Sequence, residues 1–165
     1  MLSQEEVRFL LDYREGRMYW RIPLLRNRIK AGTEAGTICL GYWKIMFRRK
    51  SYFRSNLTWI YFNGAIPARM QIDHWDRNTL NDLLDNLRLG TKQQNDFNRG
   101  VAKRSISGFK GVCPVPWKPG YWRVAIFVEG KIIRLGHFSD KIEAARAYDR
   151  AARQHFGEFA YLNFP

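Results

Sequence analysis

The segment from Gln71 to Asn98, QIDHWDRNTLNDLLDNLRLGTKQQNDFN, constrains the fold more than any other part of the chain. Its apolar spacing predicts a strand, a loop, a second strand and a helix that Thr91 can cap. Asp73 and His74 end the first strand, and Asn86 and Asn95 follow within the same short span. Adjacent strand residues point to opposite faces, so a local twist or bulge is required if Asp73 and His74 are to share a site.

A carboxylate, an imidazole and two amides supply the groups that metal-assisted phosphodiester cleavage needs. A neutral imidazole can activate a water molecule, and a divalent cation can stabilise charge on the phosphate and the leaving oxygen. Mg²⁺ prefers oxygen ligands and keeps several waters, so one carboxylate and one amide are sufficient protein ligands. We therefore expect a Mg²⁺ or Mn²⁺ site in this segment.

The charge of the chain favours a polyanionic partner. Its 165 residues carry a net charge of +13, and its pI is about 10.1, which favours nucleic acid first and an anionic membrane second. No apolar run approaches the ~20 residues that span a bilayer. The opening residues MLSQEEVRFLLDYREG lack the basic-then-apolar order of a signal peptide. These two features argue against association with a membrane. Two distant cysteines, Cys39 and Cys113, are expected to be free thiols in a reducing compartment, and we expect the cytoplasm of a bacterial or phage-infected cell.

The first half of the chain predicts several short elements. Ser3 can cap a helix, Arg17–Arg21 alternates like a strand, and alternating apolar positions between residues 38 and 46 predict further strands. Arg48-Arg49-Lys50 is typical of a basic hairpin turn. The apolar run Leu57–Phe62 ends at Asn63-Gly64.

The hydrophobic periodicity stops between Arg99 and Ser107, which indicates a basic linker. Beyond it, residues 109–113, 122–128 and 131–135 predict three strands, with Glu129-Gly130 as a tight turn. An alanine-rich helix follows, which we expect Ser139 to cap and Gly157 to end. This order predicts a small α+β module in which a three-stranded antiparallel sheet packs on one helix.

The first half resembles the HNH endonucleases of the phage and intron homing type. The match is carried by Asp73-His74, Asn86-Leu87-Arg88 and Gln94-Asn95, and it covers about residues 1–98. The resemblance implies a strand-strand-helix metal finger in which His74 is the general base, Asp73 and Asn95 hold the metal, and Asn86 braces the loop and orients His74. Two departures occur: Asn81-Asp82 inverts the usual Asp-Asn order, and Ser55-Asn56 replaces the His-Arg of many members.

The second half resembles the Apetala/ethylene-response-factor DNA-binding domain. SGFKGV, WRVAI, AARAYDRAA and the terminal LNFP occur together and in order, over about residues 107–165. That family docks its sheet in the DNA major groove, and Lys110, Trp117 and Arg134 fall at its contact positions. Strand geometry adds Lys118 and Arg123. Several family arginines are replaced by other residues in this chain, so base specificity is not carried over.

Each expected DNA contact has a simpler alternative. Arg48, Arg49, Lys50 and Lys92 are further candidates for phosphate contact, but an ordinary solvated face would also contain such cations. Trp117 is equally compatible with packing in a core.

The sequence as a whole favours a two-domain α+β protein that cleaves duplex DNA with the help of a metal ion. We predict an HNH nuclease domain over residues 1–98, a basic linker over 99–107 and a DNA-binding domain over 108–165. With one site per chain, a monomer is expected to act as a site-directed nickase of homing type. One alternative is a DNA-binding regulator with an inactive nuclease domain. Another is a protein that binds or cuts RNA, although the sheet lacks a clear set of stacking aromatic residues.

Overall fold

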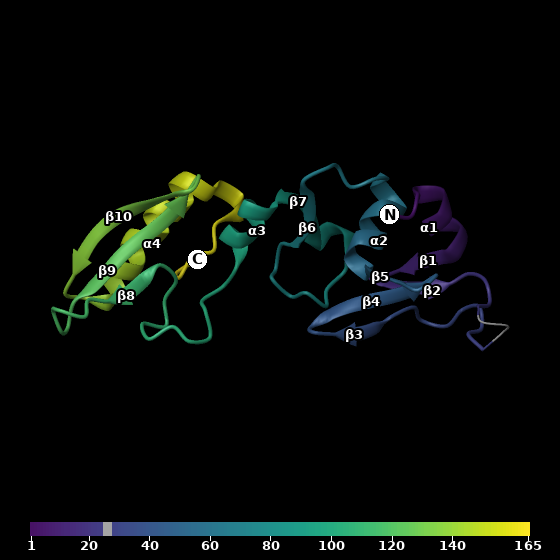
Figure 1. Cartoon of the computed structure of the whole chain (residues 1–165), viewed down its shortest axis with the longest axis horizontal. Coiled ribbons are helices and arrows are strands. Elements are labelled where there is room, and N and C mark those ends of the chain that lie inside the picture. The colour runs from purple at the N-terminus through teal and green to yellow at the C-terminus, as the bar shows by residue number, and fades with distance from the viewer. Residues whose placement is uncertain (25–27) are drawn as a thin grey trace. The chain divides into compact units, whose positions relative to one another are not determined.

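The computed structural model describes residues 1–24 and 28–165. The chain divides into two compact units, Met1–Lys92 and Gln93–Pro165. Both combine helices with small antiparallel sheets, which confirms the α+β prediction (Figure 1).

The first unit begins with a helix and a hairpin. Ser3 caps α1 (Gln4–Leu10) as predicted: its hydroxyl accepts from the Glu6 amide at 3.1 Å, and the Glu6 carboxylate accepts from the Ser3 amide at 2.9 Å. The strands β1 (Leu11–Arg14) and β2 (Arg17–Trp20) then pair antiparallel. This reciprocal cap fixes the start of α1 and therefore the point at which the chain enters the core.

A three-stranded meander forms the second layer of this unit. It consists of β3 (Thr37–Cys39), β4 (Tyr42–Phe47) and β5 (Lys50–Phe53), in the order β3-β4-β5. Arg48 and Arg49 make the tight turn between β4 and β5 with positive φ values of 48° and 62°, as the hairpin prediction required. The apolar run forms α2 (Arg54–Asn63), which ends at Gly64.

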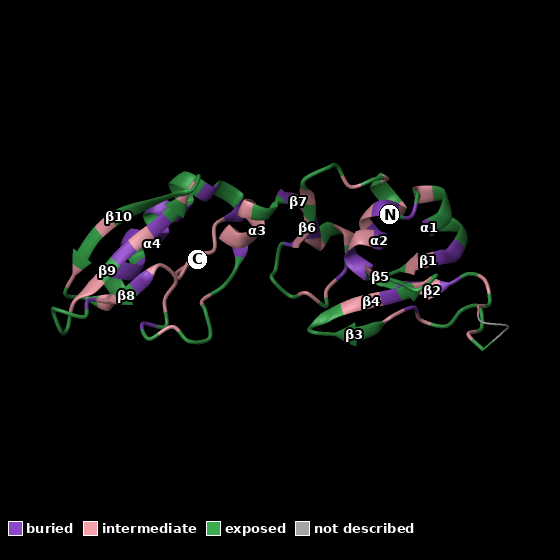
Figure 2. Cartoon of the chain, viewed as in Figure 1, coloured by how far each residue is buried: buried purple, intermediate pink, exposed green. Residues whose placement is uncertain are grey.

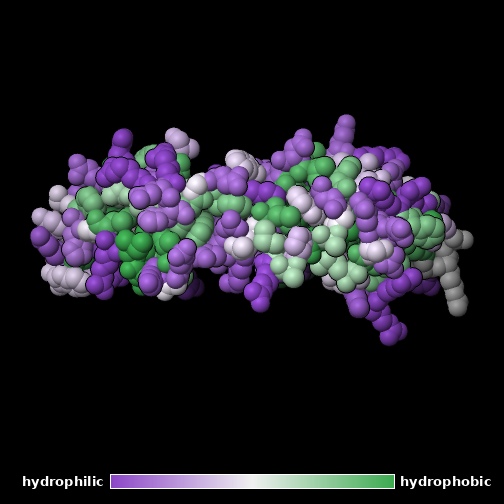
Figure 3. Space-filling view, turned by 90° about the horizontal axis from the view of Figure 1, so that it is seen from above, coloured by the Kyte–Doolittle hydropathy of each residue, from purple (hydrophilic) through white to green (hydrophobic). Residues whose placement is uncertain are grey.

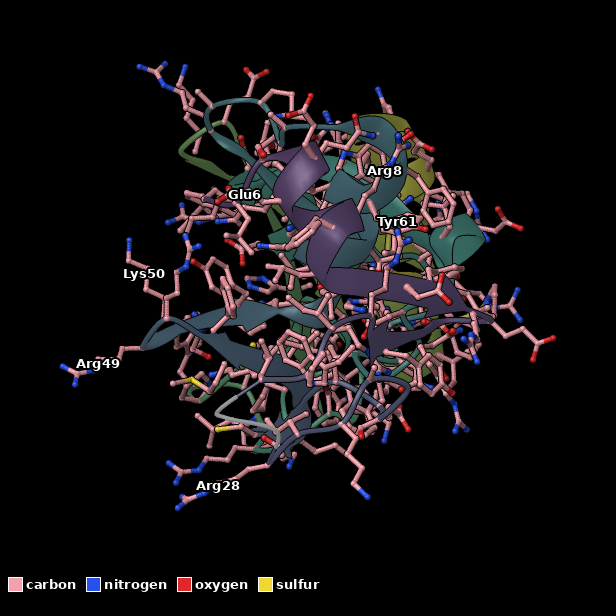
Figure 4. All side chains as sticks on the ribbon, turned by 90° about the vertical axis from the view of Figure 1, so that its right-hand side faces the viewer. Glu6, Arg8, Arg28, Arg49, Lys50 and Tyr61 are labelled. Atoms are coloured by element: carbon pink, nitrogen blue, oxygen red, sulfur yellow. The ribbon has the colours of Figure 1, made fainter. Side chains whose placement is uncertain are left out.

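The core of the first unit lies between the two helices and the strands. Arg8 ties α1 to α2, because its Nε donates to the Tyr61 carbonyl at 2.8 Å and its guanidinium lies over the Tyr61 ring (Figure 4). Most buried apolar side chains of this core are aliphatic: Val7, Leu10, Leu11, Met18, Ile45, Leu57 and Ile60. Burying such a side chain contributes about 1.5–3 kcal/mol, so these residues hold the unit together.

The motif segment folds as a hairpin followed by a helix. β6 (Met70–His74) pairs antiparallel with β7 (Leu87–Thr91), and the 3₁₀ turn η1 (Leu84–Asn86) leads into the second strand. The helix α3 (Lys92–Asn98) begins directly after Thr91. The order of strand, loop, strand and helix is therefore present, although all of α3 after Lys92 belongs to the second unit.

The second unit is a three-stranded antiparallel sheet covered by one helix. β8 (Val112–Pro114), β9 (Trp122–Val128) and β10 (Lys131–Phe138) pack on α4 (Lys141–Phe156), and η2 (Gly157–Phe159) follows it. The face of α4 toward the sheet is buried (Figure 2). Small side chains at Ala144, Ala145 and Ala152 let the helix lie close to the buried Val124 and Ile126 of β9. The predicted sheet-on-helix module is confirmed.

Three local predictions in this unit need correction. Asp140, and not Ser139, caps α4, because its Oδ1 accepts from the Ile142 and Glu143 amides at 2.6 and 2.8 Å. The first strand begins at Val112, because Gly111 has a φ of +75° that an extended strand does not contain. The third strand continues to Phe138 through a change of register between Arg134 and Gly136.

The AARAYDRAA helix, which contains Asp149, and the terminal LNFP segment, which contains Asn163, are joined by hydrogen bonds. Asp149 is buried, and its carboxylate accepts from the Asn163 and Phe164 amides at 2.8 and 2.9 Å. Asn163 in turn exchanges two hydrogen bonds with the backbone of Lys110. Burial, aided by the charge of the neighbouring Asp149, raises the pKa of the Tyr148 phenol. These contacts explain why the helix and the C-terminal segment occur as one pattern.

We predict that Gly111→Ala destabilises the second unit by about 2–5 kcal/mol, from left-handed backbone strain and overpacking together. A Cβ at this position would lie only 2.0 Å from the Tyr148 ring. Gly120→Ala is the matched control: its φ is +83° but nothing lies within 4 Å, so it should cost only the strain, about 1–2 kcal/mol. Thermal unfolding followed by circular dichroism measures both losses, and equal losses would contradict the packing explanation.

Candidate active site

The β6–β7 hairpin carries the two adjacent residues that the sequence singled out. Asp73 pairs with Arg88 and His74 with Leu87, and the register runs from Met70 to His74 without a shift. The bulge considered for this strand is therefore absent. Convergence of Asp73 and His74 on one site would rest on the twist of the hairpin alone.

His74 lies at the inner end of a buried chain of charged side chains. Its ring is only 5% exposed, and its Nε2 lies 2.9 Å from Oδ1 of Asp82, which is 2% exposed. The other carboxylate oxygen of Asp82 accepts from Nε of Arg54 at 2.7 Å. The sequence motif contains His74, but Asp82 and Arg54 come from the loop after β6 and from the first turn of α2.

Arg54 is itself held on three sides. Its Nη1 donates to Oε1 of Glu34 at 3.0 Å, and its guanidinium lies 4.1 Å from the centre of the Trp43 ring. Glu34 reaches this position because it bridges to Tyr19 of β2. A buried charge is tolerated only when it is paired and hydrogen-bonded, and these contacts meet that condition for Arg54.

Asp73 faces a different partner. Its Oδ2 accepts from Nε of Arg88 at 3.0 Å and lies 2.9 Å from Nη2, so one oxygen faces two guanidinium nitrogens in a charge-assisted contact. The Arg88 guanidinium lies 4.4 Å from the centre of the Trp75 ring. Asp73 is therefore held in a defined orientation by a cross-strand neighbour.

Asn86 closes the loop between the two strands. Its side-chain oxygen accepts from the Asp76 amide at 3.0 Å, and its Nδ2 donates to Oδ1 of Asp76 and to the Asn81 carbonyl at 2.9 and 2.8 Å. The Asn86 carbonyl also accepts from the Trp75 amide at 2.8 Å. One asparagine thus pins both ends of the loop that contains Asp82.

The Asp76 carboxyl has a lowered pKa. Burial by itself would raise this pKa from its ordinary value of 3.8. Hydrogen bonds from the Asn81 side chain, the Asn78 amide and the Asn86 side chain, together with the nearby His74, outweigh burial and lower it. The ionised carboxylate is therefore part of what orders the loop.

Asn95 stands on α3, in the second unit, and its side-chain oxygen is buried. The Phe97 ring of the same helix stacks on Phe156 of α4, with centroids 3.6 Å apart. Lys110 donates from Nζ to the carbonyls of Phe97 and Arg99, both at 2.6 Å. The ammonium of Lys110 therefore caps the end of α3, a contact that sequence reasoning had not foreseen.

Sequence reasoning missed the partners of the motif residues: Asp82, Arg54, Glu34 and Asp76. One signal pointed toward Asp82, namely the inverted Asn81-Asp82 pair. Within residues 1–24 and 28–165, no three His, Cys, Asp or Glu side chains are grouped so as to hold a metal ion.

Comparison with known proteins identifies the family. Residues 52–97 match the HNH endonuclease family. Protein 3.8 of Escherichia phage T7 is 38% identical over 104 residues, which is 62% of this chain and 83% of the phage protein. The chain belongs to the HNH endonuclease family. This family consists of phosphodiester hydrolases, and its members generally use a divalent metal.

Two further relatives extend the comparison of this HNH endonuclease. An uncharacterized HNH endonuclease of Acanthamoeba polyphaga mimivirus is 34% identical over 100 residues, 61% of this chain, and the chain covers half of that protein. An AP2/ERF and B3 domain-containing protein of Oryza sativa is 42% identical over 65 residues, 39% of this chain and 17% of the plant protein. The HNH endonuclease is thus also similar, in part, to AP2/ERF proteins.

The cations expected to meet DNA occupy two surfaces. In the first unit, Arg49 and Lys50 project from the β4–β5 hairpin (Figure 4), whereas Arg48 lies 3.7 Å from the Glu6 carboxylate. Lys92, the first residue of α3, is also exposed. Hydrophilic and hydrophobic side chains both reach the surface in the view of Figure 3.

The second surface is the face of the β8–β10 sheet that α4 leaves uncovered. Arg123 and Arg134 are exposed on it, and so are Phe127 and Ile132, which are cross-strand partners. Trp117 is 72% exposed, with its ring edge-on to His137, so it does not pack in the core. The neighbouring Lys118 lies over the Tyr121 ring at 3.5 Å.

Cys39 and Cys113 are exposed free thiols, as expected. Among the described residues, no helix has the length and the apolar character that crossing a membrane requires.

We predict that acidification loosens the loop between β6 and β7 through Asp76. Because the folded pKa is lowered, the stabilisation is fully present above the ordinary value of 3.8 and is lost as the pH falls through the folded value. Amide chemical shifts of Asp76, Asn78 and Asn86 should report the change. In Asp76→Asn that pH dependence should disappear, whereas Asp12→Asn, at an exposed carboxylate, should leave it intact. If the amide shifts of the loop change with pH in Asp76→Asn as they do in the wild type, the Asp76 carboxyl is not the cause of the change.

Proposed function

We propose that this protein is a metal-dependent endonuclease that nicks duplex DNA at a preferred site, in the manner of homing enzymes. The observation that carries the proposal is His74, held at the end of β6 by a buried carboxylate and followed by a loop that Asn86 closes. We assign cleavage to residues 1–98 and DNA binding to residues 108–165, with 99–107 as the connecting segment. This assignment crosses the boundary between the compact units, because α3 belongs structurally to the second one.

His74 would act as the general base. A water molecule attacks the phosphorus in line with the leaving 3′ oxygen, and the imidazole takes the proton of that water. The leaving 3′ oxygen takes a proton from bulk water, so the products carry 5′-phosphate and 3′-hydroxyl ends. Asn86 would contribute by holding the loop that contains the partner of His74, since it bridges Asp76 and the Asn81 carbonyl.

The residues proposed to hold Mg²⁺ or Mn²⁺ are Asp73 and Asn95. Their carboxylate and amide oxygens are the hard donors that such ions prefer, so the donor set fits the group. The bound ion would stabilise negative charge on the phosphate and on the leaving oxygen. Arg88 would keep the Asp73 carboxylate oriented, because its Nε and Nη2 both lie within 3.0 Å of Oδ2 of that residue.

The second unit would hold the DNA. Its similarity to AP2/ERF proteins, one relative being named a dehydration-responsive element-binding protein, supports DNA as the partner. Arg123, Arg134, Trp117 and Lys118 offer cations and an aromatic side chain around the uncovered sheet face. A two- or three-stranded sheet fits the major groove of B-form DNA. Lys110 would contribute mainly by fixing α3, given its contacts with the helix carbonyls.

We predict that His74→Ala lowers the rate of nicking by about 10²–10⁴-fold, since it removes the general base. Asp73→Ala should abolish cleavage and leave DNA affinity nearly unchanged, and a chelator should stop the wild type. The assay is conversion of supercoiled plasmid to nicked circles with Mg²⁺ or Mn²⁺, with filter binding for affinity. If the wild type nicks no duplex DNA but still binds it, the protein is a DNA-binding regulator with an inactive nuclease domain.

We predict that Arg123→Ala/Arg134→Ala flattens the dependence of log affinity on log salt by about 1.8, since each phosphate contact contributes ~0.9. The matched control is Arg146→Ala/Arg150→Ala, which removes the same charge from exposed positions of α4. The control should lower affinity less and leave the slope nearly unchanged. Equal slopes for the two double variants would show that the sheet face makes no special phosphate contacts.

A further inference from the structure

One departure from the usual HNH sequence contacts the residue that directly precedes the other. The inverted pair Asn81-Asp82 places a carboxylate at position 82, and Ser55-Asn56 directly follows Arg54. Asp82 and Arg54 are 28 positions apart, and both are 2% exposed. We propose that Asp82 is a positioning residue that fixes the tautomer of His74, so that Nδ1 is the nitrogen that accepts the proton of the attacking water.

The chemistry of the contact determines which nitrogen carries the hydrogen. Arg54 can only donate, so Oδ2 of Asp82 accepts from it at 2.7 Å. Oδ1 of the same carboxylate lies 2.9 Å from Nε2 of His74, and a carboxylate can only accept. Nε2 of the neutral ring therefore carries the hydrogen, and the lone pair that can act as a base lies on Nδ1.

The surroundings of Asp82 hold it in place for this role. Arg54 is clamped by the Glu34 carboxylate and the Trp43 ring, so its Nε presents a fixed donor to Asp82. A buried ionic cluster of this kind adds little stability compared with apolar side chains of similar volume. Its contribution is geometric, because it holds Arg54, Asp82 and His74 in fixed positions relative to one another. This inference rests on the proposed nuclease function for its kinetic consequence, but the tautomer itself is a property of the folded chain.

The substitution Asp82→Asn installs the residue that the family usually has at this position, and a carboxamide has only one oxygen. That oxygen can face the imidazole only where no fixed donor claims it, and in this chain Arg54 is such a donor. Arg54 can only donate and will take that oxygen, which turns the amide NH₂ toward Nε2 of His74. Nε2 must then accept, and the hydrogen moves to Nδ1. The base nitrogen is lost although the volume of the side chain and the contact with Arg54 remain.

We expect Asp82→Asn to lower kcat by at least about 100-fold with KM for duplex DNA within a factor of about two; a triad base in the wrong tautomer loses ~10⁴. Long-range ¹H–¹⁵N correlation spectra of the full chain, at alkaline pH where imidazole is neutral, read the tautomer directly. They should place the hydrogen of wild-type His74 on Nε2 and that of the variant on Nδ1. The other two histidines of the chain are assigned by substituting them in turn.

Two further variants separate positioning from simple support of the fold. Arg54→Lys keeps a cation beside the Asp82 carboxylate but loses the planar guanidinium that also reaches Glu34, so it should keep the Nε2 hydrogen and lose much less kcat than Asp82→Asn. Asp12→Asn breaks an exposed ion pair with Arg14 and should change neither the tautomer nor kcat.

The proposal is overturned if wild-type His74 carries its hydrogen on Nδ1, a measurement that needs no variant to fold. It is also overturned if Asp82→Asn keeps wild-type kcat, or if Arg54→Lys loses kcat to the same extent. A wild type that cleaves no DNA would instead count against the proposed function, and the tautomer of His74 could still be read.

Discussion

A single buried carboxylate, that of Asp82, connects the parts of the first unit that bear on chemistry. One of its oxygens faces His74 at the end of β6, and the other accepts from Arg54 at the start of α2. Through Arg54 the same chain of contacts reaches Glu34, which is joined to β2. Strand β6, helix α2 and the segment around Glu34 are thus tied to the candidate base by charge-assisted hydrogen bonds, which are short and directional, whereas hydrophobic contacts are not directional.

The hydrophobic core and this polar chain have different tasks. The aliphatic core brings α1, α2 and the strands together and tolerates modest repacking. The polar chain contains a buried ion pair, so removing Arg54 leaves the Asp82 carboxylate buried without its cationic partner. An imidazole that must present one nitrogen to a water molecule needs this second kind of support, because packing alone does not distinguish its two tautomers.

Much of the fold could be predicted from the sequence because it depends on local patterns. The alternation of β9 identified Val124 and Ile126 as buried, and the cap at Ser3 and the turn at Arg48-Arg49 followed from residue types at neighbouring positions. Ser139 was preferred to Asp140 because both are good caps and only geometry separates them. Asp82 and Arg54 escaped prediction because their pairing spans 28 positions, and no periodicity reports a contact at that range. The motif predicted His74 and Asn86, whereas their partners Asp82 and Asp76 became apparent only in the structure.

The helix α3 has a consequence for the way in which such proteins can be assembled. Its sequence belongs to the nuclease motif, yet Phe97 stacks on Phe156 and Lys110 caps its carbonyl end, both within the second unit. The two halves are therefore not freely exchangeable cassettes. A recombination event that joined a different C-terminal domain after Asn98 would separate Asn95 from the packing that orients its helix, and the new domain would have to supply an equivalent packing partner for Phe97.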